Sequence, residues 1–386
     1  MSGEAFPGFP MTKEGSAISG QLAAATRLLT QTIGDQAAQW DHEGRLPEAV
    51  LRCLSGRGVL CAQVPGEFGG LGLSGQQGGE LTAHAGSLCS SVRSVMTAQG
   101  MAAWIIQRSG NQGQRERFLA KLTGGDLAAV AFSEQAAGSD LGAMQATVRQ
   151  DGDMVVISGH KTWVTGAAYA DLIIVFARCR DGAAVVLVPA TAPGVSLEPV
   201  TDSLGCRAAG HAHVQLEDVR LPPAQLLGGA GQPLVLQLAA ALTYGRISVA
   251  WGCTGILRAC LAAVVRHARS REQFGKPLAQ HQLVARHLAE LLAGEQTATR
   301  VSEHASRCWD ERSPDMVLAA IVAKHVAAGL AARGAASAVQ VLGSAGARDS
   351  HVVARAYRDA KVMEIIEGST EICQLLLAEQ ALATQP

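Results

Sequence analysis

The sequence lacks the features by which nucleic-acid-binding, metal-binding and membrane-spanning proteins are usually recognised. Its formal net charge is −1 and no basic patch stands out, which argues against nucleic acid or an anionic membrane as a partner. The nine cysteines form no C-x-x-C pair and no Cys/His cluster at zinc spacing, so we expect reduced, buried thiols and no metal site. The best charge-free run, residues 233–242, is far too short to span a membrane.

The chain also has few aromatic residues and no recognisable secretory signal. Aromatic residues make up only 4% of the sequence although hydrophobic residues make up 48%, and much of the apolar content is alanine. Alanine favours closely packed helices over a sheet-dominated fold. The N-terminus has no basic region followed by an apolar core, so the sequence predicts a cytoplasmic protein.

Three zones of the 386-residue chain differ in their hydrophobic pattern. Apolar residues recur at helical spacings of three and four in the first zone and again in the last. The middle zone has short apolar segments separated by turn residues, which is typical of strands. The sequence therefore predicts an α+β fold: an N-terminal helical domain over residues 1–126 with a loose arm at 1–17, a middle β domain over 127–230, and a C-terminal four-helix bundle over 231–386.

Two hairpins are expected in the middle zone. The first would span residues 146–157 with a turn at Asp151-Gly152, and the second residues 171–188 with a turn at Asp181-Gly182. Pro222-Pro223 is expected to end the zone. Short, regularly spaced strands of this kind indicate a small antiparallel barrel or sandwich.

Two clusters in or beside the β zone combine small residues, hydroxyls and an aromatic ring. Residues 132–140, FSEQAAGSD, would let backbone amides approach a ligand closely, although an ordinary Gly/Ser/Asp turn explains them as well. Residues 159–166, GHKTWVTG, could place an indole face and hydroxyls against a planar cofactor. The alternative is that the tryptophan simply fills the core of the β domain.

Two further clusters lie in the C-terminal zone. Residues 270–277, SREQFGKP, contain an arginine whose planar fork suits a diphosphate, or they form a charged loop between two helices. Residues 358–371 contain Glu367 between two isoleucines and Gly368. Burial there would raise the pKa of the carboxyl and make it a base at neutral pH. Alternatively, Glu367 belongs to a capped helix N-terminus, since Ser369, Thr370 and Glu371 resemble a cap signal.

Taken in order, these clusters resemble the acyl-CoA dehydrogenase flavoprotein family over nearly the whole chain. The matching stretches span some 240 residues and keep the family's order, although Gln135, Ser344, Ile366, Ser369 and Glu371 depart from its usual residues. Those departures leave substrate choice and adenine contacts open. The stretches are residues 132–140, 204–207 with 216–222, 270–276, 340–343 and 358–367.

The resemblance implies FAD as cofactor and a role for each matching residue. Glu367 would be the catalytic base, with Arg246 beside it, and Ser139 and Gly368 would lie near the substrate thioester. Arg271 and Phe274, with Gln340, would reach the FAD of a neighbouring subunit, so a homodimer or homotetramer is implied. The full set of expected cofactor-binding residues is Phe132, Ser133, Ser139, Trp163, Thr165, Arg271, Phe274, Gln282, Gln340, Ser344, Ser369 and Glu371.

Three runs, at residues 86–91, 249–253 and 364–369, resemble one subgroup more narrowly. These are the acyl-CoA-dehydrogenase-like enzymes that make the methoxymalonyl extender unit of bacterial polyketides. The subgroup implies oxidation of 2-hydroxy-3-oxopropionyl to hydroxymalonyl on an acyl carrier protein. A conventional short-chain acyl-CoA dehydrogenase is the alternative enzyme, and a catalytically silent scaffold is the alternative of another class.

Overall fold

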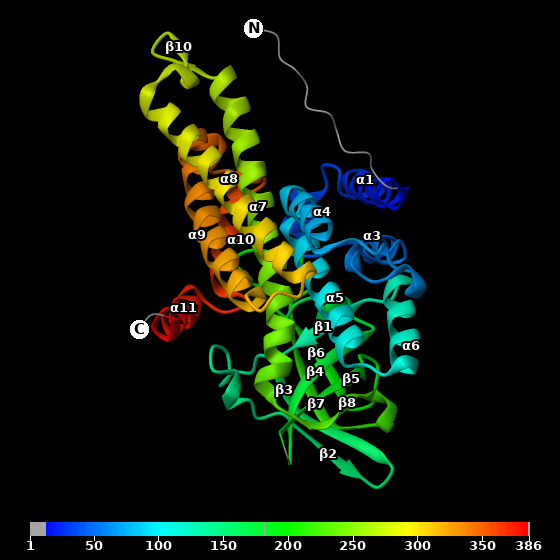
Figure 1. Cartoon of the computed structure of the whole chain (residues 1–386). Helices are drawn as coiled ribbons and strands as arrows, with labels where there is room; N and C mark the ends of the chain where they lie inside the picture. The colour runs from blue at the N-terminus through cyan, green and yellow to red at the C-terminus, as the bar shows by residue number, and fades with distance from the viewer. Residues whose placement is uncertain (1–12, 181, 385–386) are drawn as a thin grey trace.

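The computed structural model describes residues 13–180 and 182–384, and it confirms the predicted order of helical, β and helical parts (Figure 1). The helix α1 begins at Lys13, so the predicted loose arm is wrong for residues 13–17, and its residues 1–12 lie outside the described chain. Ser74 and Asn111 start α4 and α6 with capping boxes, each using a glutamine three residues on. The N-terminal helices are α1 (Lys13–Ile33), α2 (Ala37–Glu43), α3 (Glu48–Ser55), α4 (Gly75–Leu88), α5 (Ser90–Ser109) and α6 (Gln112–Thr123).

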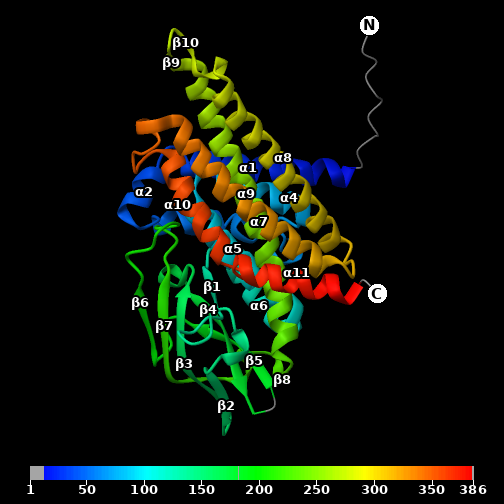
Figure 2. The same cartoon turned by 90° about the vertical axis from the view of Figure 1, so that its left-hand side faces the viewer.

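The middle part is one eight-stranded sheet, which lies below the helices with β6 and β8 at its two edges (Figure 2). Both predicted hairpins form, since β2 pairs with β3 and β4 with β5 in antiparallel fashion; Asp181, in the second turn, lies outside the described residues. The pairing is not wholly antiparallel, because β4 also pairs in parallel with β1 and β2. The strands are β1 (Ala128–Ala131), β2 (Thr147–Asp151), β3 (Met154–Val164), β4 (Leu172–Cys179), β5 (Gly182–Pro189), β6 (Val195–Pro199), β7 (Ala212–Leu221) and β8 (Leu226–Gln232).

The prediction that Pro222-Pro223 ends the β zone is wrong. The prolines end β7 and open a short 3-10 turn, Pro223–Gln225, after which β8 returns to pair with β5. Proline has no N–H for a strand ladder, but it is compatible with a turn between two strands. The sequence signal therefore marked a corner of the sheet.

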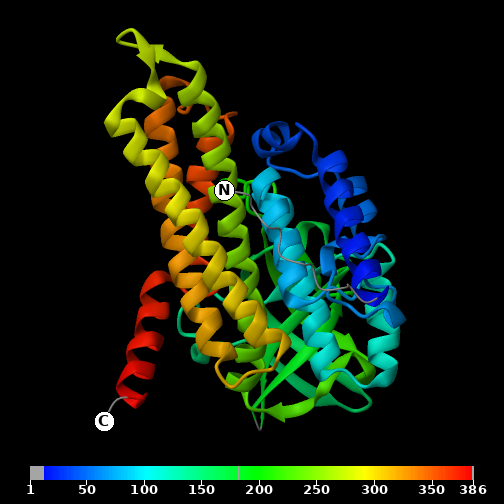
Figure 3. The same cartoon turned by 45° about the horizontal axis from the view of Figure 1, so that its top comes forward.

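The C-terminal part contains the predicted bundle, built from four packed helices, and a fifth helix that leaves it. The helix α11 emerges on the side away from the N-terminal helices (Figure 3). A small two-stranded ribbon joins α7 to α8 at the far end of the molecule from the sheet (Figure 1). The elements are α7 (Leu234–Ser270), β9 (Glu272–Gln273), β10 (Lys276–Pro277), α8 (Gln282–Asp310), α9 (Met316–Leu342), α10 (Val352–Ile365) and α11 (Thr370–Thr384).

Two of these helices, α7 and α9, are long and apolar enough to cross a membrane by length and composition alone. Most of α7 is buried in the bundle, and α9 packs against α7, α8 and α10, so both are core helices. All nine cysteines are free thiols, as predicted; seven of them are buried, and the expectation of burial is wrong for Cys53, which is exposed, and for Cys179, which is partly exposed. Among the described residues, no group of three or more His, Cys, Asp or Glu side chains could hold a metal ion.

Candidate active site

Glu367 lies in the short connection between α10 and α11 and faces the N-terminal third of α7, at Gly245. Its φ is 57°, in the left-handed region, and the following Gly368 has a φ of 93°. A Cβ on Gly245 of α7 would stand 2.3 Å from Glu367 Oε2, so only glycine at that position admits the carboxylate. The backbone turn and the missing side chain together press the carboxylate against the helix.

One oxygen of the Glu367 carboxylate, Oε2, is buried and has no hydrogen-bond partner in the part of the chain that the structure describes. Burial raises the pKa of Glu367 to about 7, against the opposing charges of Arg246, Lys324 and Arg93. A carboxyl with this pKa exchanges a proton near neutral pH, which suits a general base.

Two cations hold the backbone around Glu367. Arg246, the residue after Gly245, donates from Nε to the Glu367 carbonyl oxygen at 3.1 Å. Lys324 of α9, fully buried, donates from Nζ to the carbonyl oxygens of Glu364 (3.1 Å) and Gly368 (2.5 Å). Both contacts are made to backbone oxygens, so these cations fix the turn and leave the carboxylate free.

A buried ion pair joins the two predicted clusters of the β domain. Lys161 of β3 donates from Nζ to Glu134 Oε1 at 2.7 Å and to the Phe132 carbonyl oxygen at 3.1 Å. Hydrogen bonds from Lys161 and from the amides of Gln145 and Ala146 outweigh burial and lower the pKa of Glu134. The adjacent Thr162 amide donates to the Ser133 carbonyl oxygen at 2.9 Å, so the stretch 132–140 is held beside Trp163.

Trp163 is exposed over 54% of its surface at the end of β3, with a φ of 55°. The alternative of a tryptophan buried in the core is therefore wrong. His211 lies beside it, with ring centroids 5.9 Å apart, and its Nδ1 is 3.2 Å from Thr165 Oγ1. Burial lowers the pKa of His211 to about 4, so its imidazole is neutral at pH 7.

A second group of predicted cofactor residues lies at the opposite end of the bundle. Arg271 and Phe274 belong to the α7–α8 connection, where Phe274 is 95% exposed with a φ of 53° (Figure 1). Gln282 starts α8, and Gln340 and Ser344 are at the end of α9; all three are exposed. Because α8 begins and α9 ends at this end, the five residues share one region, away from Glu367.

The remaining predicted residues lie in the β1–β2 loop and at the start of α11. Ser139 is exposed in the loop between β1 and β2. Ser369 Oγ accepts a hydrogen bond from the Ile372 amide at 3.4 Å, and Glu371 is in the first turn of α11. The cap signal in the sequence therefore belongs to Ser369, while Glu367 lies outside α11.

The sequence analysis did not single out three residues: Arg93 and Lys324, whose charges act on Glu367, and His211, which lies beside Trp163. Arg93 and Lys324 are charged residues inside otherwise helical apolar patterns, which was their only signal. His211 directly precedes β7, two residues before His213, and its only sequence signal was this spacing of two histidines at a strand start.

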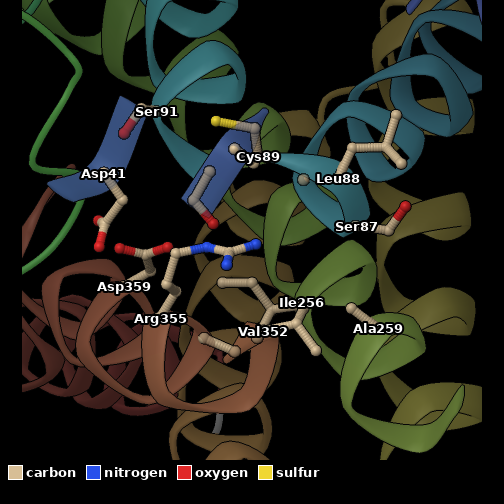
Figure 4. Close-up of a pocket in the computed structure, with 14 residues that line it drawn as sticks. Asp41, Ser87, Leu88, Cys89, Ser91, Ile256, Ala259, Val352, Arg355 and Asp359 are labelled. Carbon is tan, nitrogen blue, oxygen red and sulfur yellow. The ribbon is translucent and has the colours of Figure 1, made fainter. Parts of the chain in front are cut away.

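Two hollows lie outside this arrangement. The recess in Figure 4, where α10 meets α7 and the α4–α5 junction, measures about 20 Å³ and holds no more than a water molecule. Its Asp359 accepts a hydrogen bond from the Cys206 amide at 2.6 Å, so it joins the β domain to the bundle. A larger cavity of about 600 Å³ is lined by Tyr244, Trp309 and Arg108 among others, and Tyr244 directly precedes Gly245.

The sequence and the structure both match known proteins over almost their whole length. A solved structure described as FkbI for biosynthesis of the methoxymalonyl extender unit of the FK520 polyketide immunosuppressant is 59% identical, with a TM-score of 0.90, over 93% of this chain and 99% of that one. Butyryl-CoA dehydrogenase from Megasphaera elsdenii is 26% identical, with a TM-score of 0.90, over 97% of this chain and all of that one. Short-chain specific acyl-CoA dehydrogenase of Bos taurus mitochondria is 33% identical over 379 residues, which are 94% of this chain and 91% of the relative.

Family models cover the chain in three consecutive segments. The acyl-CoA dehydrogenase N-terminal domain matches residues 21–126, the middle domain residues 129–219 and the C-terminal domain residues 235–382. A mycobacterial glutaryl-CoA dehydrogenase with the same fold has been solved with FADH2. The chain therefore belongs to the acyl-CoA dehydrogenase family of FAD-dependent oxidoreductases.

Proposed function

We propose that this enzyme oxidises 2-hydroxy-3-oxopropionyl, held on an acyl carrier protein, to hydroxymalonyl for methoxymalonyl extender-unit supply in the bacterial cytoplasm. The observation that carries the proposal is the 59% identity to FkbI across 93% of the chain, far above the 33% shared with a short-chain acyl-CoA dehydrogenase. The substrate reacts as its hydrate: C3 loses a hydride and one hydroxyl loses a proton, which leaves a carboxyl group at C3.

The residues of the β domain fit a flavin. Trp163 offers an exposed indole face, Thr165 a hydroxyl and Ser133 backbone held in place by β3. Phe132 packs on Phe176 of β4 with ring centroids 4.7 Å apart, and this contact anchors the stretch 132–140 to the sheet. FAD, when bound, supplies the two-electron acceptor for the hydride.

Glu367 is the group that takes the hydroxyl proton from the hydrate. Its Oε2 lacks a hydrogen-bond partner among the described residues and its pKa is raised to about 7, so a substrate hydroxyl would be its natural donor. Arg246 and Lys324 hold the turn at residues 364–368 and keep the carboxylate aimed at the substrate. Ser139 and Gly368 complete the region assigned to the thioester arm.

The site is shared between subunits in this proposal. Arg271, Phe274, Gln282, Gln340 and Ser344 lie at the end of the bundle remote from Trp163 (Figure 1). They would contact the FAD of a neighbouring subunit, with Arg271 on its diphosphate. Ser369 and Glu371, beside Glu367, would contact the FAD of their own subunit. A homodimer or homotetramer follows.

The test is the anaerobic absorbance of the FAD-loaded enzyme during titration with 2-hydroxy-3-oxopropionyl on its carrier protein. We expect the flavin absorbance to bleach with this substrate and to persist with butyryl-CoA. Bleaching by butyryl-CoA alone would contradict the proposal and support the second candidate, a short-chain acyl-CoA dehydrogenase, which the similarity to the Bos taurus enzyme favours. A protein that cannot be loaded with FAD would indicate the silent scaffold.

A further inference from the structure

Arg93 of α5 is a charged residue in the core whose guanidinium hydrogen-bonds to hydroxyls and sulfur atoms and not to a carboxylate of the described chain. Its side chain is 1% exposed. Its terminal nitrogens donate to Ser94 Oγ at 2.9 Å and Thr97 Oγ1 at 3.3 Å, and Nη2 lies 2.9 Å from the sulfur of Met363. Nε has no acceptor in the described part of the chain. A guanidinium has five N–H donors, and sulfur accepts hydrogen bonds only weakly.

In residues 13–180 and 182–384 the hydrogen-bond partners of Arg93 are two hydroxyls and the sulfur atoms of Met363 and Cys206, and none of them is a carboxylate. Asp359, one turn before Met363 on α10, is already used by the Cys206 amide, and it borders the separate recess of Figure 4. Burying an unpaired charge costs several kcal/mol in general. Packing alone therefore gives no reason for an arginine at this position.

The guanidinium is on the same face of α7 as the Glu367 carboxylate. A Cβ on Gly252 would stand 2.7 Å from Arg93 Cδ, just as one on Gly245 would stand 2.3 Å from Glu367 Oε2. These glycines are seven residues apart, two helical turns on one face. Ser248 lies between them and its hydroxyl is 2.7 Å from Thr97 Oγ1. Buried hydroxyls and a buried arginine thus follow one face of α7 from the Glu367 carboxylate.

The charge of Arg93 acts on titratable groups in both the bundle and the β domain, Glu367 and His211. Its charge partly opposes the rise that burial causes in the pKa of Glu367, and it adds to the lowering that burial causes in the pKa of His211, which lies beside Trp163. Met363, its contact on α10, is four residues before Glu367. Arg93 is therefore placed between the β-domain and bundle halves of the site.

We infer that Arg93 binds the oxygens on C3 of the acyl unit and makes the enzyme selective for short, oxygenated acyl groups over hydrocarbon ones. The inference rests on the proposed function and names its specificity residue. A planar guanidinium suits the two oxygens of a hydrated aldehyde, and it suits the carboxylate of the product better still. A hydrocarbon acyl group would leave the charge unpaired in the core, which penalises the wrong substrate.

The test compares R93M and R93K with a control variant, R355M. Arg355 is an arginine of α10 that donates to the Ser350 carbonyl oxygen. Malonyl-pantetheine and butyryl-pantetheine are titrated into FAD-loaded protein, and binding is read from the shift of the flavin spectrum. Wild type and R355M should bind malonyl-pantetheine more tightly than butyryl-pantetheine. R93M should lose about 100-fold in malonyl affinity and keep or improve butyryl affinity, with R93K in between.

Thermal unfolding separates recognition from a structural role. An arginine needed for the fold would lower the melting temperature when replaced, whereas an uncompensated buried charge should leave R93M as stable as wild type or more so. Equal malonyl affinity in wild type and R93M, or equal losses for both ligands, would overturn the inference. The proposed function has a separate test: it fails if the flavin of the wild-type enzyme is not reduced by the carrier-bound 2-hydroxy-3-oxopropionyl unit.

Discussion

At the scale of single residues, the proposed chemistry depends on one carboxylate and on the groups that leave its Oε2 without a hydrogen-bond partner in the described chain. Glu367 is pressed against Gly245, and its nearest cations bond to backbone oxygens. Replacing it by glutamine keeps the shape and removes the base. For E367Q we expect flavin reduction to slow by at least about 10³-fold with FAD content unchanged, measured by anaerobic stopped-flow absorbance. Full turnover in E367Q with flavin bound would show that the base lies elsewhere.

The pH dependence follows from the same carboxyl. Because burial raises the pKa of Glu367 to about 7 and the base acts as carboxylate, the rate constant for reduction should rise about tenfold per pH unit up to pH 7 and level off above it. The folded state favours the protonated form between the ordinary pKa of 4.5 and about 7, so the charge costs stability above pH 7. E367Q should therefore melt higher than wild type at pH 8 and no higher at pH 4. A flat rate profile between pH 5 and 8 would contradict this assignment.

Gly245 offers a second test at the residue scale. G245A places a methyl group where Glu367 Oε2 and Met101 Cε now lie, at 2.3 and 2.5 Å from the new Cβ. Alanine favours the helix itself. We expect normal folding by circular dichroism and loss of most flavin reduction, because the carboxylate must move. G255A, also on α7, would instead meet the backbone of Ala83 and should mainly destabilise the protein.

At the scale of elements, the Lys161–Glu134 pair sets the shape of the loop that is assigned to the flavin. Removing one partner leaves a buried charge, which typically costs about 3–5 kcal/mol of stability. E134Q should therefore lower the midpoint of urea unfolding and release FAD more easily. The double variant E134L/K161M should regain much of the stability but not the FAD affinity, because Phe132 and the Gln145 and Ala146 amides lose their partners. Equal FAD affinity in all three proteins would exclude this positioning role.

The elements themselves were largely predictable, because their patterns are local. The hairpins at residues 146–157 and 171–188 follow from turn residues between apolar segments, and the bundle follows from helical spacing. The parallel pairing of β1 with β4 was not predictable, since it joins segments some forty residues apart whose composition does not encode direction. The same holds for Arg93: its partners come from α5, α7 and α10, and only the fold brings them together.

At the scale of the whole molecule, the division of the predicted cofactor residues into two remote groups implies a composite site. We expect R271A and E367Q, each nearly inactive alone, to complement each other when they are co-expressed or mixed after unfolding. In a mixed pair of subunits, the site with Glu367 from the R271A subunit and Arg271 from the E367Q subunit is intact, and the other site carries both substitutions. One flavin of each such pair should therefore be reduced. Activity of the isolated variants and of purified mixed oligomers measures this, and lack of complementation would place Arg271 on its own subunit's flavin.

The continuity of α7 sets both a length and an angle for the enzyme. Gly245 meets the base, Gly252 meets Arg93, and Ser270 ends the helix at the ribbon that carries Arg271. Between Gly245 and Ser270 the axis runs for about 38 Å at about 100° per residue. An insertion of one residue beyond Gly252 would turn the ribbon by that angle while leaving the contacts at Gly245 and Gly252 unchanged, whereas seven residues would restore its direction but lengthen the spacer by about 10 Å. Insertions and deletions within α7 would therefore change both the distance and the direction of the ribbon relative to Glu367, and are constrained at both ends of the helix.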